Sequence, residues 1–361
     1  MKKITVQLGR TSYPIIIGKG VLKQVPSLMS SYRQSDKGVI VTDERIWKLY
    51  GQQFCECLKE NGLEIFPFVM PRGEKRKNLV WVRKIYDFLI EKGCDRSSFV
   101  IAFGGGVIGD LAGFVAATYM RGIRFFQVPT TLLAQVDASI GGKVGVNVPQ
   151  GKNLVGAFYQ PSAVLIDYSL LKTLSYREMR CGMAEVIKYG IIHNTDLFAF
   201  LEEQMTSVYS FSYQSLERII SDSCQIKAAV VSEDEKESGL RAILNFGHTI
   251  GHALETDAFY KNISHGEGVS IGMVVAARIS HKMGYIPKEL VLRIENLIKK
   301  AGLPIRYSQL NIPEIIRIMK IDKKRVKGVL HFVLLSQLGS PLITSEVGEE
   351  TIKMVLKEIK A

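Results

Sequence analysis

The chain has 361 residues, enough for two domains of roughly 150 residues each. Hydrophobic residues make up 47% and charged residues 23%, a globular composition that excludes a disordered chain. No apolar run reaches the roughly 18 residues that cross a bilayer, and the first residues lack a signal-peptide pattern. We therefore expect a soluble, cytoplasmic protein without a membrane partner.

The formal net charge is +12, from 47 basic and 35 acidic residues. These residues are spread along the chain and form no basic stripe with interleaved aromatics. That pattern disfavours nucleic acid as a partner and favours an anionic metabolite. The five cysteines include no C-x-x-C pair, so neither a disulfide framework nor a thiolate zinc cluster is expected.

The first half of the chain alternates between short β-branched runs and stretches of helical length. After an alternating N-terminus, strands are predicted at Tyr13–Ile17, Val39–Val41, Ile65–Val69, Phe99–Phe103, Phe125–Val128 and Ala163–Ile166. Helices are predicted at Lys77–Glu91 and Asp110–Tyr119. This alternation predicts an α/β domain with a largely parallel sheet, which we place at residues 1–174.

Helical patterns dominate after about Leu174. Helices are predicted at Tyr176–Ile192, Ser215–Val231, Asn245–Glu255, Gly266–Met283 and Lys288–Ala301. A strand run returns at Leu330–Leu335. Residues 175–361 are therefore predicted to form an α-helical domain.

A glycine cluster follows the predicted strand Phe99–Phe103. Gly104, Gly106 and Gly109 satisfy the pattern G-x-G-x-x-G, which lets the backbone approach a pyrophosphate at a helix N-terminus. The acid that usually follows about 20 residues later to hold a ribose is missing. Because Asp43 follows an earlier strand, we predict a dinucleotide site of non-standard arrangement, with its acid before the glycine motif in the sequence. The alternative is a tight strand–helix turn without a ligand.

The connection Pro129–Gly156 combines glycines with Thr, Asp, Lys and Asn and has little periodicity. We interpret it as a binding loop, in which Lys143, Lys152 and Asn153 could contact phosphate or carboxylate oxygens. A solvated loop with surface lysines is the alternative, and the spacing leaves both open.

Three of the six histidines lie close together in the sequence, at His248, His252 and His265. His248 and His252 are four residues apart and share a helix face, so spacing alone favours them as a metal-binding pair. The candidate carboxylates beside them are Glu185, Glu255 and Glu267. A zinc peptidase is disfavoured, because Thr249 stands where a zincin has Glu.

Together, these motifs resemble those of 3-dehydroquinate synthases, in the sugar phosphate cyclase superfamily. The matching segments, in the family's order, are Gly104–Asp110 (GGGVIGD), Tyr119–Gly122 (YMRG), Pro129–Val146 (PTTLLAQVDASIGGKVGV), Gly151–Gly156 (GKNLVG), Met183–Gly190 (MAEVIKYG), Asn245–Glu255 (NFGHTIGHALE) and His265–Met273 (HGEGVSIGM). With further matches near the end, the resemblance covers nearly the whole chain.

The resemblance implies a Rossmann-like NAD-binding α/β domain, an all-α C-terminal domain and an active site in the cleft between them. It implies a Zn²⁺ ion, replaceable by Co²⁺, held by Glu185, His248 and His265. His252 would then contact substrate, which differs from the metal pair that spacing favours.

The family's contacts can be transferred residue by residue. Those expected to bind NAD⁺ are Asp43, Arg72, Gly73, Glu74, Lys75, Arg76, Lys77, Gly105, Gly106, Val107, Ile108, Gly109, Asp110, Thr130, Thr131, Lys143, Lys152, Leu170, Leu171, Lys172 and Thr173. Those expected to hold substrate are Asp137, Lys143, Lys152, Asn153, Lys188, Lys227, Arg241, Asn245, His252 and one lysine of the pair Lys323 and Lys324, here assigned to Lys324. Arg121 resembles an arginine that reaches a neighbouring active site, which implies a homodimer. The family usually has an acid and an aromatic at positions 72 and 76, where this chain has arginine.

The implied reaction converts 3-deoxy-D-arabino-heptulosonate 7-phosphate into 3-dehydroquinate and phosphate, in the shikimate pathway of aromatic amino acid biosynthesis. NAD⁺ would take up and return a hydride, and the metal would acidify the hydroxyl to be oxidised. One alternative is another sugar phosphate cyclase, acting on glucose 6-phosphate or sedoheptulose 7-phosphate. The other is a metal-dependent NAD polyol dehydrogenase. Lys227 and Arg241 favour the carboxylated substrate.

Overall fold

The computed structural model describes residues 1–257, 263–325 and 330–360, except for the side chains of 321–325. The described residues form two compact units. Unit 1 comprises Met1–Leu174 and Tyr213–Lys236, and unit 2 comprises Ser175–Ser212 and Glu237–Ala361. This division differs from the expected one in helix α8 (Tyr213–Glu233), which belongs to unit 1. Hydrogen bonds hold α8 there: the Gln7 N–H donates to Ser232 Oγ at 2.8 Å, and the Tyr168 hydroxyl to Glu217 Oε2 at 3.0 Å.

Unit 1 is built on a seven-stranded sheet with the order β1-β2-β9-β6-β5-β3-β4. The strands are β1 (Lys2–Val6), β2 (Tyr13–Gly18), β3 (Lys37–Asp43), β4 (Glu64–Met70), β5 (Phe99–Gly104), β6 (Arg124–Pro129) and β9 (Ala163–Asp167). Neighbours pair in parallel, except that β1 and β2 are antiparallel. This pairing confirms the predicted, largely parallel sheet. The prediction was possible because strands buried on both faces give continuous apolar runs in the sequence.

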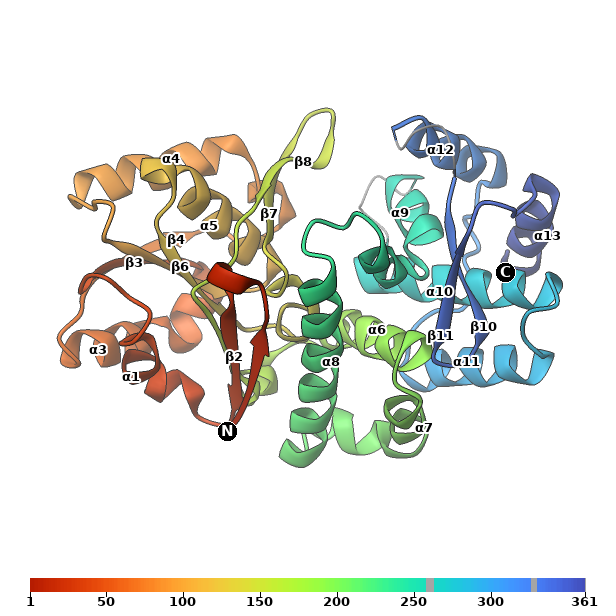
Figure 1. Cartoon of the computed structure of the whole chain (residues 1–361), viewed down its shortest axis with the longest axis horizontal. Coiled ribbons are helices and arrows are strands. Elements are labelled where there is room, and N and C mark those ends of the chain that lie inside the picture. The colour runs from red at the N-terminus through yellow and green to blue at the C-terminus, as the bar shows by residue number, and fades with distance from the viewer. Residues whose placement is uncertain (258–262, 326–329, 361) are drawn as a thin grey trace. The chain divides into compact units, whose positions relative to one another are not determined.

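Helices cover both faces of this sheet (Figure 1). Helices α1 (Val25–Met29) and α3 (Gln52–Glu60) pack on one face, and α4 (Leu79–Glu91) and α5 (Gly106–Thr118) on the other. Alternate residues of each strand enter the two cores. In β3, Val39 and Val41 pack with α4 and α5, whereas Ile40 packs with α1 and α3.

The connection that we expected to be a loop contains an antiparallel hairpin of β7 (Lys143–Val148) and β8 (Gly151–Phe158). Gly145 and Gly156 lie opposite each other, and a Cβ on Gly145 would be 2.8 Å from the Val155 carbonyl oxygen. The glycines permit this close pairing but interrupt the apolar alternation by which strands are recognised. The prediction of a loop was therefore wrong.

Unit 2 consists mainly of helices. They are α6 (Tyr176–Ile192), α7 (Thr195–Tyr209), α9 (His248–Asp257), α10 (His265–Lys282), α11 (Lys288–Lys300), α12 (Ile312–Arg325) and α13 (Glu349–Ile359). The sequence predicted α6, α9, α10 and α11 but missed α7, α12 and α13. We expected an all-α domain, but the unit also contains a hairpin of β10 (Phe332–Gln337) and β11 (Ser340–Thr344). The Leu335 N–H attaches this hairpin to α10 by donating to Ser280 Oγ at 3.0 Å.

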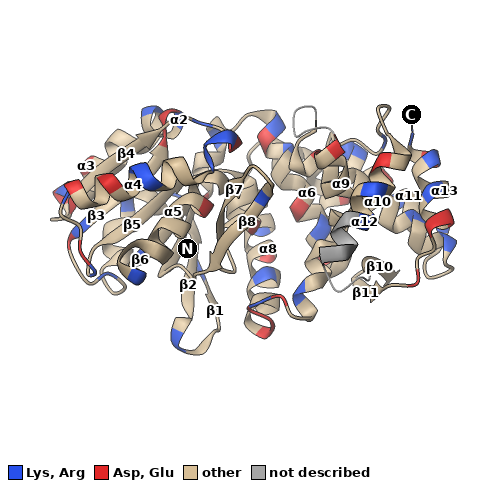
Figure 2. Ribbon diagram, turned by 90° about the horizontal axis from the view of Figure 1, so that it is seen from above, with Lys and Arg blue, Asp and Glu red and all other residues tan. Residues whose placement is uncertain are grey.

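Lysine and arginine alternate with aspartate and glutamate along the helices of each unit (Figure 2). Many of these side chains form ion pairs between helices, such as Arg278 with Glu295 at 2.7 Å and Arg293 with Glu202 at 2.7 Å. This arrangement differs from the one-sided basic surface typical of nucleic-acid-binding proteins. Within the described ranges, no helix is both long and apolar enough to cross a membrane.

Candidate active site

Glycines allow α9 and α10 of unit 2 to pack backbone against backbone. A Cβ on Gly251 would lie 3.0 Å from the Gly268 carbonyl carbon, and one on Gly272 would overlap the Gly247 carbonyl oxygen. Side chains at these positions would force the helices apart. The two G-x-x-x-G spacings of the histidine motifs therefore bring the two helices together.

The start of α10 is held equally closely against α6. A Cβ on Gly266 would lie 2.5 Å from Cys181 Cα, one turn before Glu185. A capping box fixes the first turn of α10, because the Ser264 hydroxyl and the Glu267 carboxylate each accept the other's backbone N–H. His265, the first helical residue, is thereby directed towards α6.

Glu185, His248 and His265 meet where these three helices converge. The Glu185 side chain is fully buried, and its Oε1 lies 3.5 Å from both His248 Nε2 and His265 Nε2. One ligand atom from each residue lies within 4.8 Å of the others. Donor atoms about 2.1 Å from one tetrahedral ion lie roughly 3.4 Å apart. The separations therefore suit a shared divalent metal ion.

The second ring nitrogen of each imidazole also has the partner that a metal ligand needs. His248 Nδ1 lies 3.2 Å from the Phe246 carbonyl oxygen, which can only accept, so Nδ1 carries the hydrogen. His265 Nδ1 lies 2.9 Å from Glu255 Oε1. Both rings thus direct Nε2 towards Glu185, as in carboxylate–histidine–metal arrangements. This donor set fits the expected metal.

Electrostatics at the two histidines differ. Burial, with the Lys188 ammonium as the next cause, lowers the pKa of His248 well below 6.5, so this imidazole is neutral. Burial also opposes charge on His265, but hydrogen bonds to Glu185 and Glu255 outweigh it and raise the pKa of His265 well above 6.5. A metal cation at Nε2 could replace the proton that these two carboxylates stabilise.

His252 and Lys188 border this cluster. The ring of His252 is exposed and lies 5.2 Å from that of His248 and 6.1 Å from that of His265, centroid to centroid. His252, Glu255 and His265 form a second group with metal-ligand geometry. We favour the Glu185 group, because Glu255 already holds His265 Nδ1. The Lys188 side chain is 2% exposed and pairs with Glu185 Oε2.

Apart from Lys143 and Lys152, which lie on the hairpin β7–β8, the residues expected to bind NAD⁺ lie at one edge of the unit 1 sheet. Asp43 ends β3, residues 72–77 follow β4, residues 105–110 follow β5, Thr130 and Thr131 follow β6, and residues 170–173 follow β9. These strands are parallel, so their carboxyl ends share an edge. Adjacent strands β3 and β5 continue to opposite sides, through α3 to β4 and through α5 to β6. Dinucleotides bind at such a switch point.

The glycine loop meets the requirements of a pyrophosphate site. Gly105 is the extended N-cap of α5 and lacks a side chain that could cap the helix. A Cβ on Gly105 would lie 3.1 Å from Thr131 Cγ2. Just after the first turn of α5, Asp110 pairs with the Lys77 ammonium, whose side chain is 5% exposed. Burial raises the pKa of Asp110, against the opposing effect of Lys77.

Two predicted substrate residues come together because α8 belongs to unit 1. Lys227 Nζ donates to the carbonyl oxygen and to Oδ1 of Asp137, both at 2.6 Å. The Lys227 side chain is 7% exposed. The sequence predicted both residues but placed Lys227 in the helical domain.

The other predicted substrate residues are spread over several elements. In unit 2, Arg241 is buried, and Asn245 Nδ2 donates to Glu237 Oε1 at 3.0 Å. Sequence reasoning missed Glu237, which stands outside every quoted motif. Lys143, Lys152 and Asn153 lie on the hairpin β7–β8. Arg121 follows α5 in unit 1, and Lys324 lies in the part of α12 whose side chains are outside the description.

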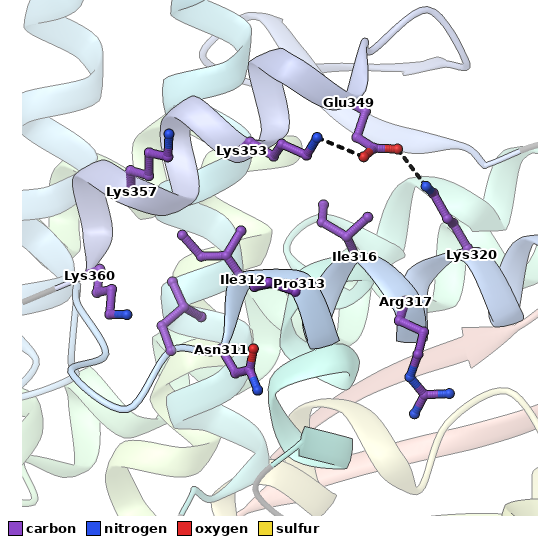
Figure 3. Close-up of a pocket in the computed structure, with 11 residues that line it drawn as sticks. Asn311, Ile312, Pro313, Ile316, Arg317, Lys320, Glu349, Lys353, Lys357 and Lys360 are labelled. Atoms are coloured by element: carbon purple, nitrogen blue, oxygen red, sulfur yellow. Dashed lines mark ion pairs between the residues drawn. The ribbon is translucent and has the colours of Figure 1, made fainter.

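A groove of about 900 Å³ lies between α12 and α13 (Figure 3). Its apolar lining includes Leu310 and Ile316, and Glu349, which also lines it, pairs with Lys320 at 2.7 Å and Lys353 at 3.0 Å. Among the residues whose side chains the structure describes, none that is predicted for metal, cofactor or substrate lines this groove. The candidate active-site residues are therefore those of the cluster in unit 2 and of the sheet edge in unit 1.

Known proteins resemble this chain over its whole length. Family models described as 3-dehydroquinate synthase N-terminal and C-terminal match residues 67–181 and 182–325. The chain is 49% identical over 360 residues to 3-dehydroquinate synthase of Crocosphaera subtropica, covering 99% of each chain. A solved 2-deoxy-scyllo-inosose synthase, complexed with carbaglucose-6-phosphate, NAD⁺ and Co²⁺, is 30% identical with a TM-score of 0.90, covering 99% of this chain and 100% of that one. ValA, a 2-epi-5-epi-valiolone synthase from Streptomyces hygroscopicus with NAD⁺ and Zn²⁺ bound, is 26% identical with a TM-score of 0.91, covering 98% of each. The chain belongs to the 3-dehydroquinate synthase family.

Proposed function

We propose that this chain carries out the 3-dehydroquinate synthase reaction with one set of residues from each unit. The reaction converts 3-deoxy-D-arabino-heptulosonate 7-phosphate into 3-dehydroquinate and phosphate, and the enzyme is a phosphate-eliminating lyase. The observation that best supports a role for these residues is the cluster of Glu185, His248 and His265, in which each imidazole has the second partner that a ligand needs.

In unit 2, we propose that Glu185, His248 and His265 hold a zinc ion. When bound, the ion would act as a Lewis acid that lowers the pKa of a substrate hydroxyl. His252 and Lys188 border the cluster and would contact substrate oxygens by hydrogen bonds. These two side chains would orient the hydroxyl to be oxidised and exchange protons with it.

In unit 1, we propose that the edge around Asp43 and Gly105 holds NAD⁺. When bound, NAD⁺ would accept a hydride and later return it, so the cofactor would not be consumed. Asp43 Oδ1 accepts the backbone N–H groups of Arg45 and Ile46, which fixes the carboxylate at the end of β3. We propose that this carboxylate holds a ribose, the role for which the glycine motif provides no acid.

The basic residues supply recognition of an anionic substrate. Lys227 is held by Asp137, and Lys152 and Asn153 stand together on β8. We propose that they bind the phosphate and carboxylate through charge-assisted hydrogen bonds. Buried Arg241 would add a rigid, planar donor for the carboxylate.

We further propose a cytoplasmic homodimer in which Arg121 reaches the neighbouring active site. Met120 and Arg121 have left-handed backbone conformations, with φ of 49° and 66°. Met120 is 43% exposed, and Leu154 and Phe158 of the hairpin are 50% and 45% exposed. Exposed apolar side chains of this kind favour a subunit interface.

Phosphate release from 3-deoxy-D-arabino-heptulosonate 7-phosphate tests the proposed function, with NAD⁺ far below substrate and zinc supplied. We expect many phosphates per NAD⁺ without net NADH. No release from protein shown to hold zinc and NAD⁺ would refute the substrate, and net NADH would indicate a dehydrogenase.

A mixture of two inactive variants, R121A and H265A, tests the dimer. If Arg121 acts in the neighbouring site, mixed dimers contain one complete site and regain activity. If Arg121 acts within its own subunit, no mixture contains a complete site and activity stays absent.

A further inference from the structure

A ring of hydrogen bonds joins the segment after β4 to the hairpin β7–β8 within unit 1. The Asn147 N–H donates to the Lys77 carbonyl oxygen at 2.8 Å, and Asn147 Nδ2 donates to Glu74 Oε1 at 2.8 Å. Asn147 Oδ1 accepts the Asn153 N–H at 3.0 Å. Lys77 Nζ closes the ring by donating to Asn153 Oδ1 at 2.6 Å.

From this ring we infer that Asn147 is a positioning residue that couples the cofactor segment to the substrate-binding strand. The inference rests on the proposed function, with Asn153 binding substrate, and on the expectation from the family's motifs that Glu74 and Lys77 bind NAD⁺. Asn147 itself belongs to neither set. Its side-chain amide uses its oxygen towards one set and its nitrogen towards the other, so neither segment can move without breaking one of these bonds.

The ring also fixes the orientation of the Asn153 amide. An ammonium group can only donate, so Asn153 Oδ1 must face Lys77, and its NH₂ group remains as the donor for a substrate oxygen. Asn153 has a left-handed backbone conformation with φ of 54°, which asparagine tolerates better than most residues. Its backbone N–H is held in that conformation by Asn147 Oδ1.

The variant Asn147→Ala tests this inference in the full-length, metal-loaded enzyme. The two readouts are the Kd for NAD⁺ and the KM for substrate at saturating NAD⁺. Because one hydrogen bond to each segment is lost, we expect both constants to rise roughly three- to tenfold. Asn147→Asp keeps the acceptor for Asn153 but sets a carboxylate beside Glu74. It should raise the Kd for NAD⁺ more than the KM for substrate. This variant replaces the alanine variant in the test if the alanine variant does not fold.

A double-mutant cycle separates positioning from a general structural role. If Asn147 acts on substrate through Asn153, the KM effect of N147A should disappear in the N153A background. Asn61→Ala is the matched control, because Asn61 Nδ2 donates to the Cys57 carbonyl oxygen at 2.8 Å, outside both sets. It should lower stability without changing either constant.

Two results would overturn the inference: N147A with both constants within twofold of wild type, or a KM effect of unchanged size in the N153A background. Failure of the proposed function gives a different result, since the wild type would then release no phosphate. The NAD⁺ titration would still measure the effect of N147A on the Kd for NAD⁺.

Discussion

Replacing Glu255 by alanine should weaken metal binding although Glu255 is not proposed as a ligand. Its Oε1 accepts from His265 Nδ1 at 2.9 Å, and its side chain is 8% exposed, so solvent cannot replace it readily. A hydrogen bond to a charged group contributes about 1.5–3 kcal/mol. Since each 1.4 kcal/mol is about tenfold, the Kd for zinc should rise roughly 10- to 100-fold. Glu255→Gln can still accept a neutral hydrogen bond and should give an intermediate Kd.

The assay is competition for Zn²⁺ against a chromogenic chelator, with unfolding measured in parallel. Glu295→Gln is the control, because Glu295 is equally buried in unit 2 but pairs with Arg278 on α10. This variant should lower the melting temperature and leave the Kd for zinc unchanged. Zinc lost completely in E255A but retained in E185A would instead identify Glu255 as the ligand and refute our choice of cluster.

Three further changes test the same region. Gly272→Ala places a methyl group against the carbonyl oxygen of Gly247, so it should cost about 1–3 kcal/mol of stability and lower the zinc content. Gly348→Ala is the control, because the space around the new Cβ is open, and it should leave the zinc content unchanged. Lys188→Met removes a buried cation beside the ligands, so zinc should bind at least as tightly while turnover falls; weaker zinc binding would contradict a substrate role. Burial raises the pKa of Glu267, but hydrogen bonds from the capping box and an arginine outweigh it and hold the pKa below 4.5. The stability lost in Glu267→Gln, about 1 kcal/mol, should therefore be seen in full above pH 5 and should disappear as pH falls through the lowered folded pKa; a pH-independent difference in melting temperature would refute this assignment.

Local patterns explain why much of the fold was predictable. The strand Phe99–Phe103 and the glycines after it are contiguous, and each constrains the backbone at its own position. The histidine motif is similar, since Gly247 and Gly251 lie beside His248 in the sequence and also fix its place in space. Such segments report both their conformation and their chemistry.

The position of α8 shows where local patterns fail. Its apolar periodicity predicts a helix, and the helix is present as Tyr213–Glu233. The periodicity contains no information about which unit covers the apolar face. Ser232 and Lys227 decide this through partners more than 80 residues away in the sequence, at Gln7 and Asp137.

The candidate site likewise contains residues that the sequence identifies and residues that only distant contacts identify. Chemistry and spacing alone favoured His248 and His252 and left the carboxylate open among Glu185, Glu255 and Glu267, whereas the set Glu185, His248 and His265 came from the family's motifs. The residues that hold them have ordinary identities, and their contribution depends on distant contacts: Glu255 with His265 across two helices, and Asn147 with Glu74 across 73 positions of sequence. A ligand can therefore be proposed from the motif in which it stands, whereas a positioning residue becomes visible only when the atoms on both sides of it are placed. Variants of Glu255 and Asn147 are accordingly the most informative, because they test the part of the site that only the structure reveals.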